Sequence, residues 1–166
     1  ILEGTALSYP VVQGQDNEYY LDRLFDGSYN ASGCLFLDSR CEARFASPNS
    51  IVYGHHMKDG SMFAALDGYK EQEFYEAHPS LLLLTPGGDY EAQVFSAYVA
   101  PTDAAAWRLD FEGEGAYAAW LAEVCAASRI ETGLVPGQAE RVLTLSTCSY
   151  EFSDARLVVH CVLREL

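Results

Sequence analysis

The C-terminal part of the chain contains two β-rich runs joined by a connection so short that they can pair only as antiparallel strands. The runs RVLTLSTC (141–148) and ARLVVHCVLREL (155–166) are rich in β-branched and aliphatic residues. Seven residues separate Cys148 from Arg156. Because so short a connection leaves no room for a helical crossover, the two runs are predicted to form an antiparallel pair. Cys148 and Arg156 are then expected near each other at the end of this hairpin.

Several earlier segments also have the pattern of short strands and turns. Short apolar runs bounded by Gly, Pro, Asn, Asp or Ser predict strands and a hairpin. The predicted strands cover residues 9–14 (YPVVQG), 32–40 (SGCLFLDSR) and 50–54 (SIVYG), and the predicted hairpin covers 80–101 with its turn at TPGGD. The chain shows no strand–helix alternation, which favours a mainly antiparallel barrel over a parallel α/β sheet.

Helical segments are predicted around this β structure. Between residues 115 and 129 the apolar positions recur at i, i+3, i+4, i+7 and i+8, the stripe of an amphipathic helix, and this is the longest predicted helix. Shorter helical pieces are predicted at 15–27, 62–66 and 72–79. No internal repeat or low-complexity tract interrupts the chain, so residues 1–166 are predicted to form one domain.

The composition restricts the class of partner. Hydrophobic residues make up 49% of the 166 residues and aromatic residues 13%, enough to bury a core. Ten basic against 24 acidic residues give a formal net charge of −14, which argues against a nucleic-acid partner. A cationic peptide or an amine would be attracted to such a surface. The alternative interpretation is that the acidity only keeps the domain soluble. No apolar run is long enough for a membrane span, so an anchor is expected only outside this chain.

The five cysteines are not equivalent. An odd number leaves at least one thiol free, and no CxxC pair or Cys/His cluster has zinc spacing, so no metal or other cofactor is expected. Cys34, Cys125 and Cys161 lie in apolar runs, where a cysteine is usually a small buried side chain. The pairing of Cys34 and Cys41 stays open, as does any role of Cys161. Only Cys148 lies beside polar residues at the end of a predicted strand.

Cys148, Arg156 and one histidine make a candidate catalytic set. A cysteine nucleophile acts as its thiolate, which a neighbouring imidazole can generate, and a guanidinium can stabilise a thiolate or an oxyanion. His55 and His56 follow the strand predicted at 50–54. Because adjacent strand residues point to opposite faces, at most one of them is expected to reach Cys148. On these residues alone, an inert cysteine beside a surface arginine is an equally good interpretation.

Four motifs of the chain, which occur in the family's order, resemble those of the class B sortases, cysteine transpeptidases of the Gram-positive cell surface. Two motifs carry most of the resemblance, and two are weaker. The first two are IVYGHHMKDGSMF (51–63) and TLSTCSYEFSDARLVVH (144–160), and the weaker ones are YPVVQGQDNEYYL (9–21) and GCLFLDSR (33–40). The LSTC element followed closely by Arg is typical of sortases, and YGHHMKDGSMF is typical of the class B branch.

The resemblance implies a fold and a reaction. The fold is mainly β, a closed antiparallel β-barrel of about eight strands with peripheral helices, including a long helix before the strand that carries the cysteine. The reaction is cleavage of a C-terminal sorting motif of the type Asn/Ser/Pro-Pro-x-Thr-Gly/Asn through a thioacyl enzyme. The Thr carbonyl is then joined to an amine of a cell-wall precursor or peptidoglycan. The implied location is the outer face of the cytoplasmic membrane, with a single-pass N-terminal anchor that this chain lacks.

The resemblance also assigns roles to residues. His55 takes the place of the catalytic histidine, Cys148 that of the nucleophile and Arg156 that of the essential arginine. The substrate-binding candidates are Ser146, Thr147, Tyr150 and Glu151.

Three other functions remain open at this point. A pilin-polymerising sortase would use a lysine of another pilin subunit as acceptor. A cysteine protease would hydrolyse the thioester with water. A non-catalytic barrel would only bind peptides, although such a module has no need of His55, Cys148 and Arg156 together.

Overall fold

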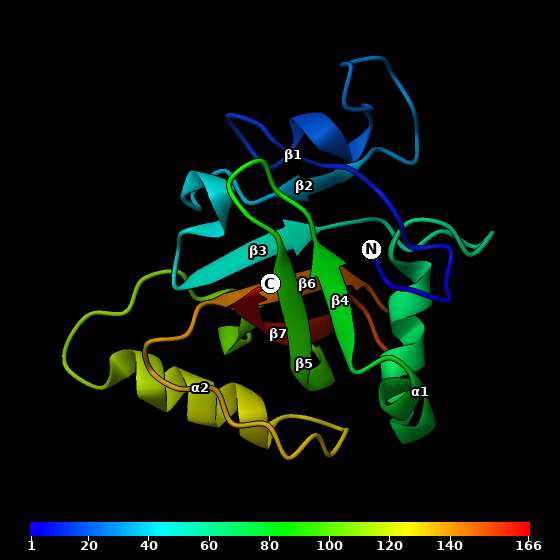
Figure 1. Ribbon diagram of the computed structural model, residues 1–166. Coiled ribbons are helices and arrows are strands. Elements are labelled where there is room, and N and C mark those ends of the chain that lie inside the picture. Colours follow the sequence, from blue (N-terminus) through cyan, green and yellow to red (C-terminus); the bar gives the residue numbers. More distant parts are fainter.

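Seven strands form one strongly curved sheet in the order β1-β2-β3-β6-β7-β5-β4 (Figure 1). The computed structural model describes residues 1–166. The strands are β1 (Val11–Gln13), β2 (Leu35–Leu37), β3 (Asn49–Tyr53), β4 (Ser80–Leu83), β5 (Tyr90–Ala100), β6 (Val142–Cys148) and β7 (Arg156–Glu165). The predicted mainly β fold with peripheral helices is confirmed.

The sheet differs in detail from the predicted closed antiparallel barrel of about eight strands. It has seven strands, and β1 with β2 and β3 with β6 are parallel pairs. The other four neighbouring pairs are antiparallel. β1 and β4 are the two edges and do not pair with each other. Instead, the backbone N and O of Ile1 bond to Leu82 at 2.7 and 2.8 Å, which covers the β4 edge.

The hairpin of β6 and β7 has the predicted antiparallel register. Cys148 lies directly opposite Arg156, and the ladder continues to Val142 opposite Val162. Strand β7 lies between β6 and β5 and is buried on both faces, so its apolar run is nearly continuous. This central position holds both ends of the connecting loop, residues 149–155, against the rest of the sheet.

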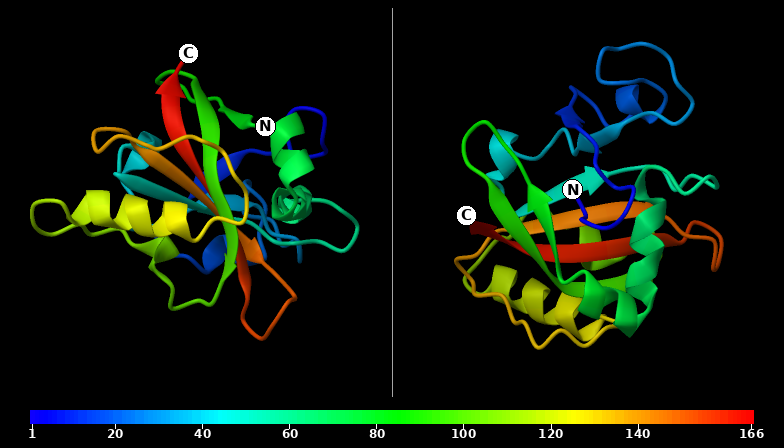
Figure 2. Two further views of the ribbon diagram at one scale, coloured as in Figure 1. Left: turned by 90° about the horizontal axis from the view of Figure 1, so that it is seen from below. Right: turned by 45° about the vertical axis from the view of Figure 1, so that its right-hand side comes forward.

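Helices pack on the two faces of the sheet (Figure 2). Helix α2 (Ala116–Ala126) is shorter than the predicted 115–129 and buries Trp120, Leu121 and Val124 against the outer face of β5 and β7. The 3₁₀ helix η3 (Phe63–Lys70) and helix α1 (Gln72–Ala77) follow β3, where short helices were expected at 62–66 and 72–79, and η3 packs into the inner core. The remaining helices are short 3₁₀ turns, η1 (Tyr19–Leu21), η2 (Ala43–Phe45) and η4 (Ala105–Trp107).

Of the short helical piece predicted within 15–27, only the three residues of η1 are helical. No residue of this segment is buried, so no apolar stripe holds a helix against the sheet. The side chain of Asp16 accepts hydrogen bonds from the backbone N–H groups of Glu18 and Tyr19 at 2.9 and 2.8 Å. This local turn replaces the first helical hydrogen bonds.

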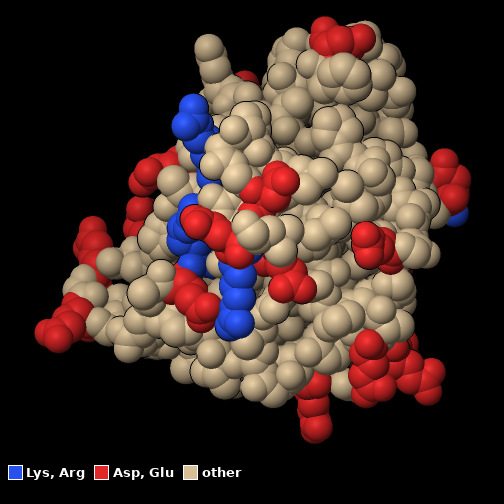
Figure 3. All heavy atoms as spheres, viewed as in Figure 1, with Lys and Arg blue, Asp and Glu red and all other residues tan.

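The surface charge is distributed unevenly. On the face in Figure 3, acidic side chains are spread widely, while the basic side chains gather mainly in one narrow region. Six of the ten Lys and Arg side chains contact a carboxylate (Arg23, Arg40, Lys70, Arg129, Arg141 and Arg164). None of the helices is both long and apolar enough to span a bilayer.

Candidate active site

A cavity of about 270 Å³ opens at the ends of β3, β6 and β7. Its walls come from three parts of the chain: the segment before β2, the β2–β3 pair, and the β6–β7 hairpin. The lining residues are Asn17, Leu21, Phe36, Tyr53, Gly54, His55, Ser146, Thr147, Cys148 and Arg156. The structure therefore brings His55, Cys148 and Arg156 into one cavity, together with Ser146 and Thr147.

The parallel pairing of β3 with β6 carries His55 to this cavity. Tyr53 lies opposite Ser146, and the Gly54 N–H continues the ladder with a 3.2 Å hydrogen bond to the Ser146 carbonyl. A Cβ atom on Gly54 would lie 2.3 Å from a methyl carbon of Leu35 and 2.6 Å from the Phe63 ring. Only glycine fits this close approach, which lets the chain follow β6 as far as His55.

Cys148 and Arg156 are direct neighbours across the β6–β7 ladder, and both are half-buried. The Arg156 guanidinium donates one hydrogen bond, from Nη1 to the Ala155 carbonyl at 3.1 Å. No carboxylate lies within ion-pair distance of it, although the chain has 24 acidic residues. Its other N–H groups are therefore available to an acceptor that enters the cavity.

The imidazole of His55 is oriented by a backbone carbonyl. Its Nε2 lies 2.7 Å from the carbonyl oxygen of Leu21. Because a carbonyl oxygen accepts hydrogen bonds only, Nε2 must carry a proton. Nδ1 is then the ring nitrogen that gains or loses a proton. This arrangement suits a histidine that alternates between general base and general acid.

His56 has different surroundings, as strand alternation predicts. Its Nε2 lies 2.6 Å from the Asp67 carboxylate, and its ring meets the edge of the Tyr150 ring at 5.3 Å between centroids. His56 does not line the cavity. Its contacts instead connect the segment after β3 to η3 and to the loop between β6 and β7.

The structure does not bring Tyr150 and Glu151 into the cavity. Tyr150 is 69% exposed, and its hydroxyl lies 3.4 Å from the His56 carbonyl oxygen. Glu151 accepts two hydrogen bonds from Arg129, at 3.2 and 3.0 Å, and lies 3.6 Å from Lys70. The pKa of Glu151 is lowered, first by the Arg129 hydrogen bond. Both residues hold the β6–β7 loop in place.

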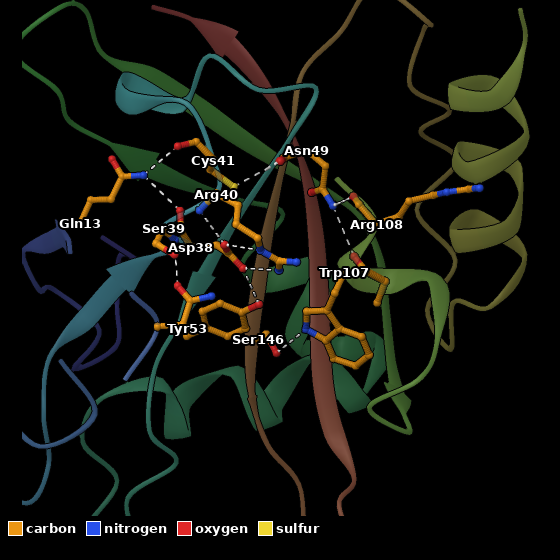
Figure 4. Close-up of polar contacts among 12 residues, drawn as sticks. Gln13, Asp38, Ser39, Arg40, Cys41, Asn49, Tyr53, Trp107, Arg108 and Ser146 are labelled. Atoms are coloured by element: carbon orange, nitrogen blue, oxygen red, sulfur yellow. Dashed lines mark hydrogen bonds and ion pairs between the residues drawn. The ribbon is translucent and has the colours of Figure 1, made fainter. Parts of the chain in front are cut away.

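Ser146 is placed by a residue that the sequence analysis did not select. The indole Nε1–H of Trp107, in η4, donates to the Ser146 hydroxyl oxygen at 3.1 Å (Figure 4). The Ser146 hydroxyl therefore keeps its own proton for another acceptor. Thr147 is buried, and its hydroxyl has no hydrogen-bond partner.

All five cysteines are free thiols, and their surroundings separate Cys148 from the rest. Cys34, Cys41 and Cys161 are buried, and Cys125, in helix α2, is half-buried against the apolar cluster between α2 and the sheet. Burial raises the pKa of each of these four thiols, most strongly that of Cys161. A raised pKa reduces the thiolate that reacts with electrophiles. Cys148 is the thiol that lines the cavity.

Besides Gly54, four lining residues were not predicted from the sequence: Asn17, Leu21, Phe36 and Tyr53. Asn17 and Leu21 belong to the segment interpreted as a helix, where no local pattern indicates a binding site. Tyr53 could have been selected, because it is the tyrosine of the YG–His55 motif and the last residue of β3. Phe36 reaches the cavity through its cross-strand pairing with Tyr53.

Comparison with known proteins supports the same picture. The sortase domain family matches residues 2–164. The chain is 39% identical to sortase B of Staphylococcus aureus, over 95% of this chain and 66% of that protein. It is 33% identical to sortase B of Listeria monocytogenes, over 93% of this chain and 64% of that protein. The chain thus spans slightly less than two thirds of either relative.

A solved structure extends the likeness to three dimensions. The Staphylococcus aureus sortase B-substrate complex superimposes with a TM-score of 0.94 at 37% identity, covering 100% of this chain and 78% of that one. The similarity therefore includes the whole curved sheet and its helices. The chain belongs to the sortase family, and its relatives within that family are sortases B.

Proposed function

We propose that the protein is a cysteine transpeptidase that cleaves a C-terminal sorting motif of surface proteins and transfers the acyl part to an amine. The proposal rests on one observation: Cys148, its cross-strand neighbour Arg156 and His55 all line the same cavity. The same three residues were expected from the sequence motifs. Membership of the sortase family supports the same assignment.

The first half of the reaction breaks the peptide. Nδ1 of His55 takes the Cys148 thiol proton, and the resulting thiolate attacks the carbonyl carbon of the motif's Thr. The carbonyl oxygen becomes an oxyanion that Arg156 N–H groups can bind. Collapse of this intermediate breaks the C–N bond. The leaving amine takes a proton from Nδ1 of His55, because Nε2 is committed to the Leu21 carbonyl. The product is a thioester between Cys148 and the Thr carbonyl.

The second half joins the acyl group to its acceptor. An amine attacks the thioester carbon and gives a proton to Nδ1 of His55, while the Cys148 sulfur leaves as thiolate. The net change exchanges one amide for another, so no cofactor or oxidant is consumed. Ser146 and Thr147, which line the cavity, are proposed to contact the donor peptide.

The proposed substrate is a motif of the type Asn/Ser/Pro-Pro-x-Thr-Gly/Asn, and the proposed acceptor is an amine of the cell wall. A superimposable sortase B has been solved as a substrate complex, which supports the proposal that this chain also binds a substrate. The net charge of −14 favours approach of a protonated amine. The proposed location is the outer face of the cytoplasmic membrane.

The test is mass spectrometry of the products from Pro-x-Thr-Gly-type peptides, with and without an added glycine-type or diaminopimelate-type amine. We expect the amine in the product, together with slow hydrolysis when no amine is offered. Cys148→Ala should give neither product. Fast cleavage that never incorporates an amine would favour a cysteine protease, and incorporation of only a pilin-type lysine peptide would favour a pilin polymerase. Peptide binding without any turnover would favour a non-catalytic barrel.

A further inference from the structure

Asp38 is a fully buried carboxylate directly behind the cavity. It follows β2, and its backbone N–H donates to the Ile51 carbonyl at 2.8 Å. Its two carboxylate oxygens accept hydrogen bonds from the Arg40 guanidinium at 3.0 and 2.7 Å. The Tyr53 hydroxyl donates to one of the same oxygens at 3.0 Å. Figure 4 shows these bonds meeting at Asp38.

The charge of Asp38 is stable at its buried position. Burial alone would raise the pKa of this carboxyl, but hydrogen bonds from Arg40 and from Tyr53 outweigh burial and lower it to about 2. Arg40 is its only cationic partner, and 62% of that side chain is exposed. A carboxylate that is both charged and buried requires several donors, and breaking such a set is costly. Asp38 is therefore a permanent acceptor for Tyr53.

Tyr53 connects this buried carboxylate to the cavity. The Tyr53 ring lines the cavity, lies opposite Phe36 on β2 and opposite Ser146 on β6. The Phe36 and Tyr53 ring centroids are 5.4 Å apart. Phe36, Tyr53 and Ser146 thus form one row across three strands, and all three line the cavity. The hydrogen bond to Asp38 determines where the middle member of that row lies.

A second lining residue is tied to the same turn. The Asn17 side-chain oxygen accepts a hydrogen bond from the Ser39 N–H at 2.8 Å. Ser39 lies between Asp38 and Arg40, and the Arg40 N–H donates to Asp38 at 2.9 Å, which closes the turn. The Asn17 amide and the Tyr53 ring are far apart in the sequence, but the turn at 38–40 orients both. None of these contacts involves His55, Cys148 or Arg156.

We propose that Asp38 is a positioning residue for the donor peptide, which with Arg40 holds Tyr53 and Asn17 as the wall of the cavity that contains Cys148. This role rests on the proposed function. It predicts a loss of peptide binding without a loss of thiol chemistry, because the wall and the reacting groups are held by separate contacts. A wall whose side chains are already oriented costs less conformational entropy when the peptide binds.

The experiment compares Tyr53→Phe, Asp38→Asn and the double variant. Tyr53→Phe deletes only the hydroxyl group and keeps the ring. This variant therefore still tests the proposal if Asp38→Asn fails to fold. We expect KM for the sorting peptide to rise about fivefold to tenfold in Tyr53→Phe and at least tenfold in Asp38→Asn, with kcat within about twofold. The double variant should be no worse than Asp38→Asn alone, since both changes break the same contact.

Two further readouts separate binding from chemistry. The Kd of the same peptide, measured by fluorescence anisotropy in a Cys148→Ala background, should rise by the same factors as KM. The rate at which iodoacetamide alkylates Cys148 should stay unchanged. Matched controls are Tyr117→Phe, whose hydroxyl donates to the Glu140 carbonyl at 2.8 Å, and Asp89→Asn in the β4–β5 turn, where it accepts from Thr85 at 3.2 Å.

The outcomes distinguish the two proposals. A KM in Tyr53→Phe within about twofold of the wild type, while the wild type turns over the peptide, overturns only the positioning role. A parallel fall of kcat, peptide affinity and alkylation rate also overturns it, because the effect is then a general distortion of the fold. If the wild-type protein neither binds nor cleaves a sorting peptide, the proposed function fails together with this inference.

Discussion

Replacing Arg156 by lysine keeps the charge but removes the planar set of donors. A guanidinium has five N–H donors in a rigid fork, and the Ala155 carbonyl occupies one of them at 3.1 Å. Arg156 is the cross-strand partner of Cys148, and both residues line the cavity. A lysine ammonium carries three donors on a flexible stem and cannot bind an oxyanion in the same two-bond geometry.

The magnitude follows from the reaction that Arg156 is proposed to support. Losing one donor to an oxyanion typically reduces kcat by about 10²-fold to 10³-fold, or about 2.7–4 kcal/mol. We expect Arg156→Lys to lose at least about 100-fold in kcat/KM on a fluorogenic sorting peptide. Stability should change by less than about 1 kcal/mol, because Arg156 is half-buried and has no ion pair. Urea unfolding of the variant tests that part.

Arg164→Lys is the matched control, because Arg164 belongs to the same strand and pairs with Glu140 at 3.4 Å near the other end of β7. This control should keep the wild-type kcat/KM. An Arg156→Lys variant within about threefold of the wild type would refute the donor argument and leave Arg156 with no more than a charge effect. A large loss of stability in the same variant would show instead that Arg156 holds the hairpin.

Three further predictions use the same peptide assay or unfolding. Iodoacetamide should modify Cys148 first and Cys161 last, since burial raises the pKa of the Cys161 thiol; mass spectrometry of digests checks the order. His55→Ala should abolish turnover, while His56→Ala should reduce it only in part, because His56 binds Asp67 outside the cavity; equal losses would contradict this. The lowered pKa of Asp38 stabilises the fold by about 2 kcal/mol above pH 4, and this contribution is lost as the pH falls through about 2. The difference in urea-unfolding stability between wild type and Asp38→Asn should therefore shrink by more than half between about pH 5 and about pH 2.5.

The fold could be predicted from the sequence wherever neighbouring segments determine it. The short connection from Cys148 to Arg156 gave the β6–β7 pairing in the correct register, and the 3.6-residue period gave helix α2. The parallel pairs of β1 with β2 and of β3 with β6 depend on contacts between distant segments, and no local pattern encodes them. The segment at 15–27 has helical residues but no face to bury, so its propensity did not produce a helix.

In the candidate site, too, the residues of local motifs could be predicted, and those that depend on contacts between distant segments could not. His55, Cys148 and Arg156 belong to local motifs, and strand alternation separates His55 from His56. The residues that orient them come from elsewhere: Leu21 provides the carbonyl for His55, and Asp38 lies behind the wall. Such partners are visible only when the chain is folded.

Tyr150 and Glu151 illustrate the opposite case. Both lie in the motif around Cys148 and were expected, from the resemblance to class B sortases, to contact the substrate. Glu151 instead pairs with Arg129, 22 residues away, and Tyr150 lies against His56. The partners are Lys70 in η3, Arg129 in the segment after α2, and His56 in the segment after β3. The motif around Cys148 does not reveal them. The proximity of two residues in sequence thus predicts little about loop side chains that point outward.

Strand β6 is the element on which the site depends, because it has a parallel neighbour on one side and an antiparallel neighbour on the other. A slip of one residue on either side would turn Cys148 away from His55 or from Arg156. Buried polar contacts oppose such a slip. Thr144 donates to Asn49 of β3 at 2.6 Å and contacts His160 of β7 at 2.9 Å.

The same chain of contacts continues to β5. His160 is fully buried, lies 3.1 Å from the Tyr98 hydroxyl, and has its pKa lowered to about 3 by burial, so it remains neutral at physiological pH. Any other register would leave these groups unpaired in the core, at a cost of about 1–3 kcal/mol for each group. The four strands β3, β6, β7 and β5 are therefore linked by side chains that do not line the cavity. We infer that this buried set keeps the histidine, the cysteine and the arginine at the same end of the sheet.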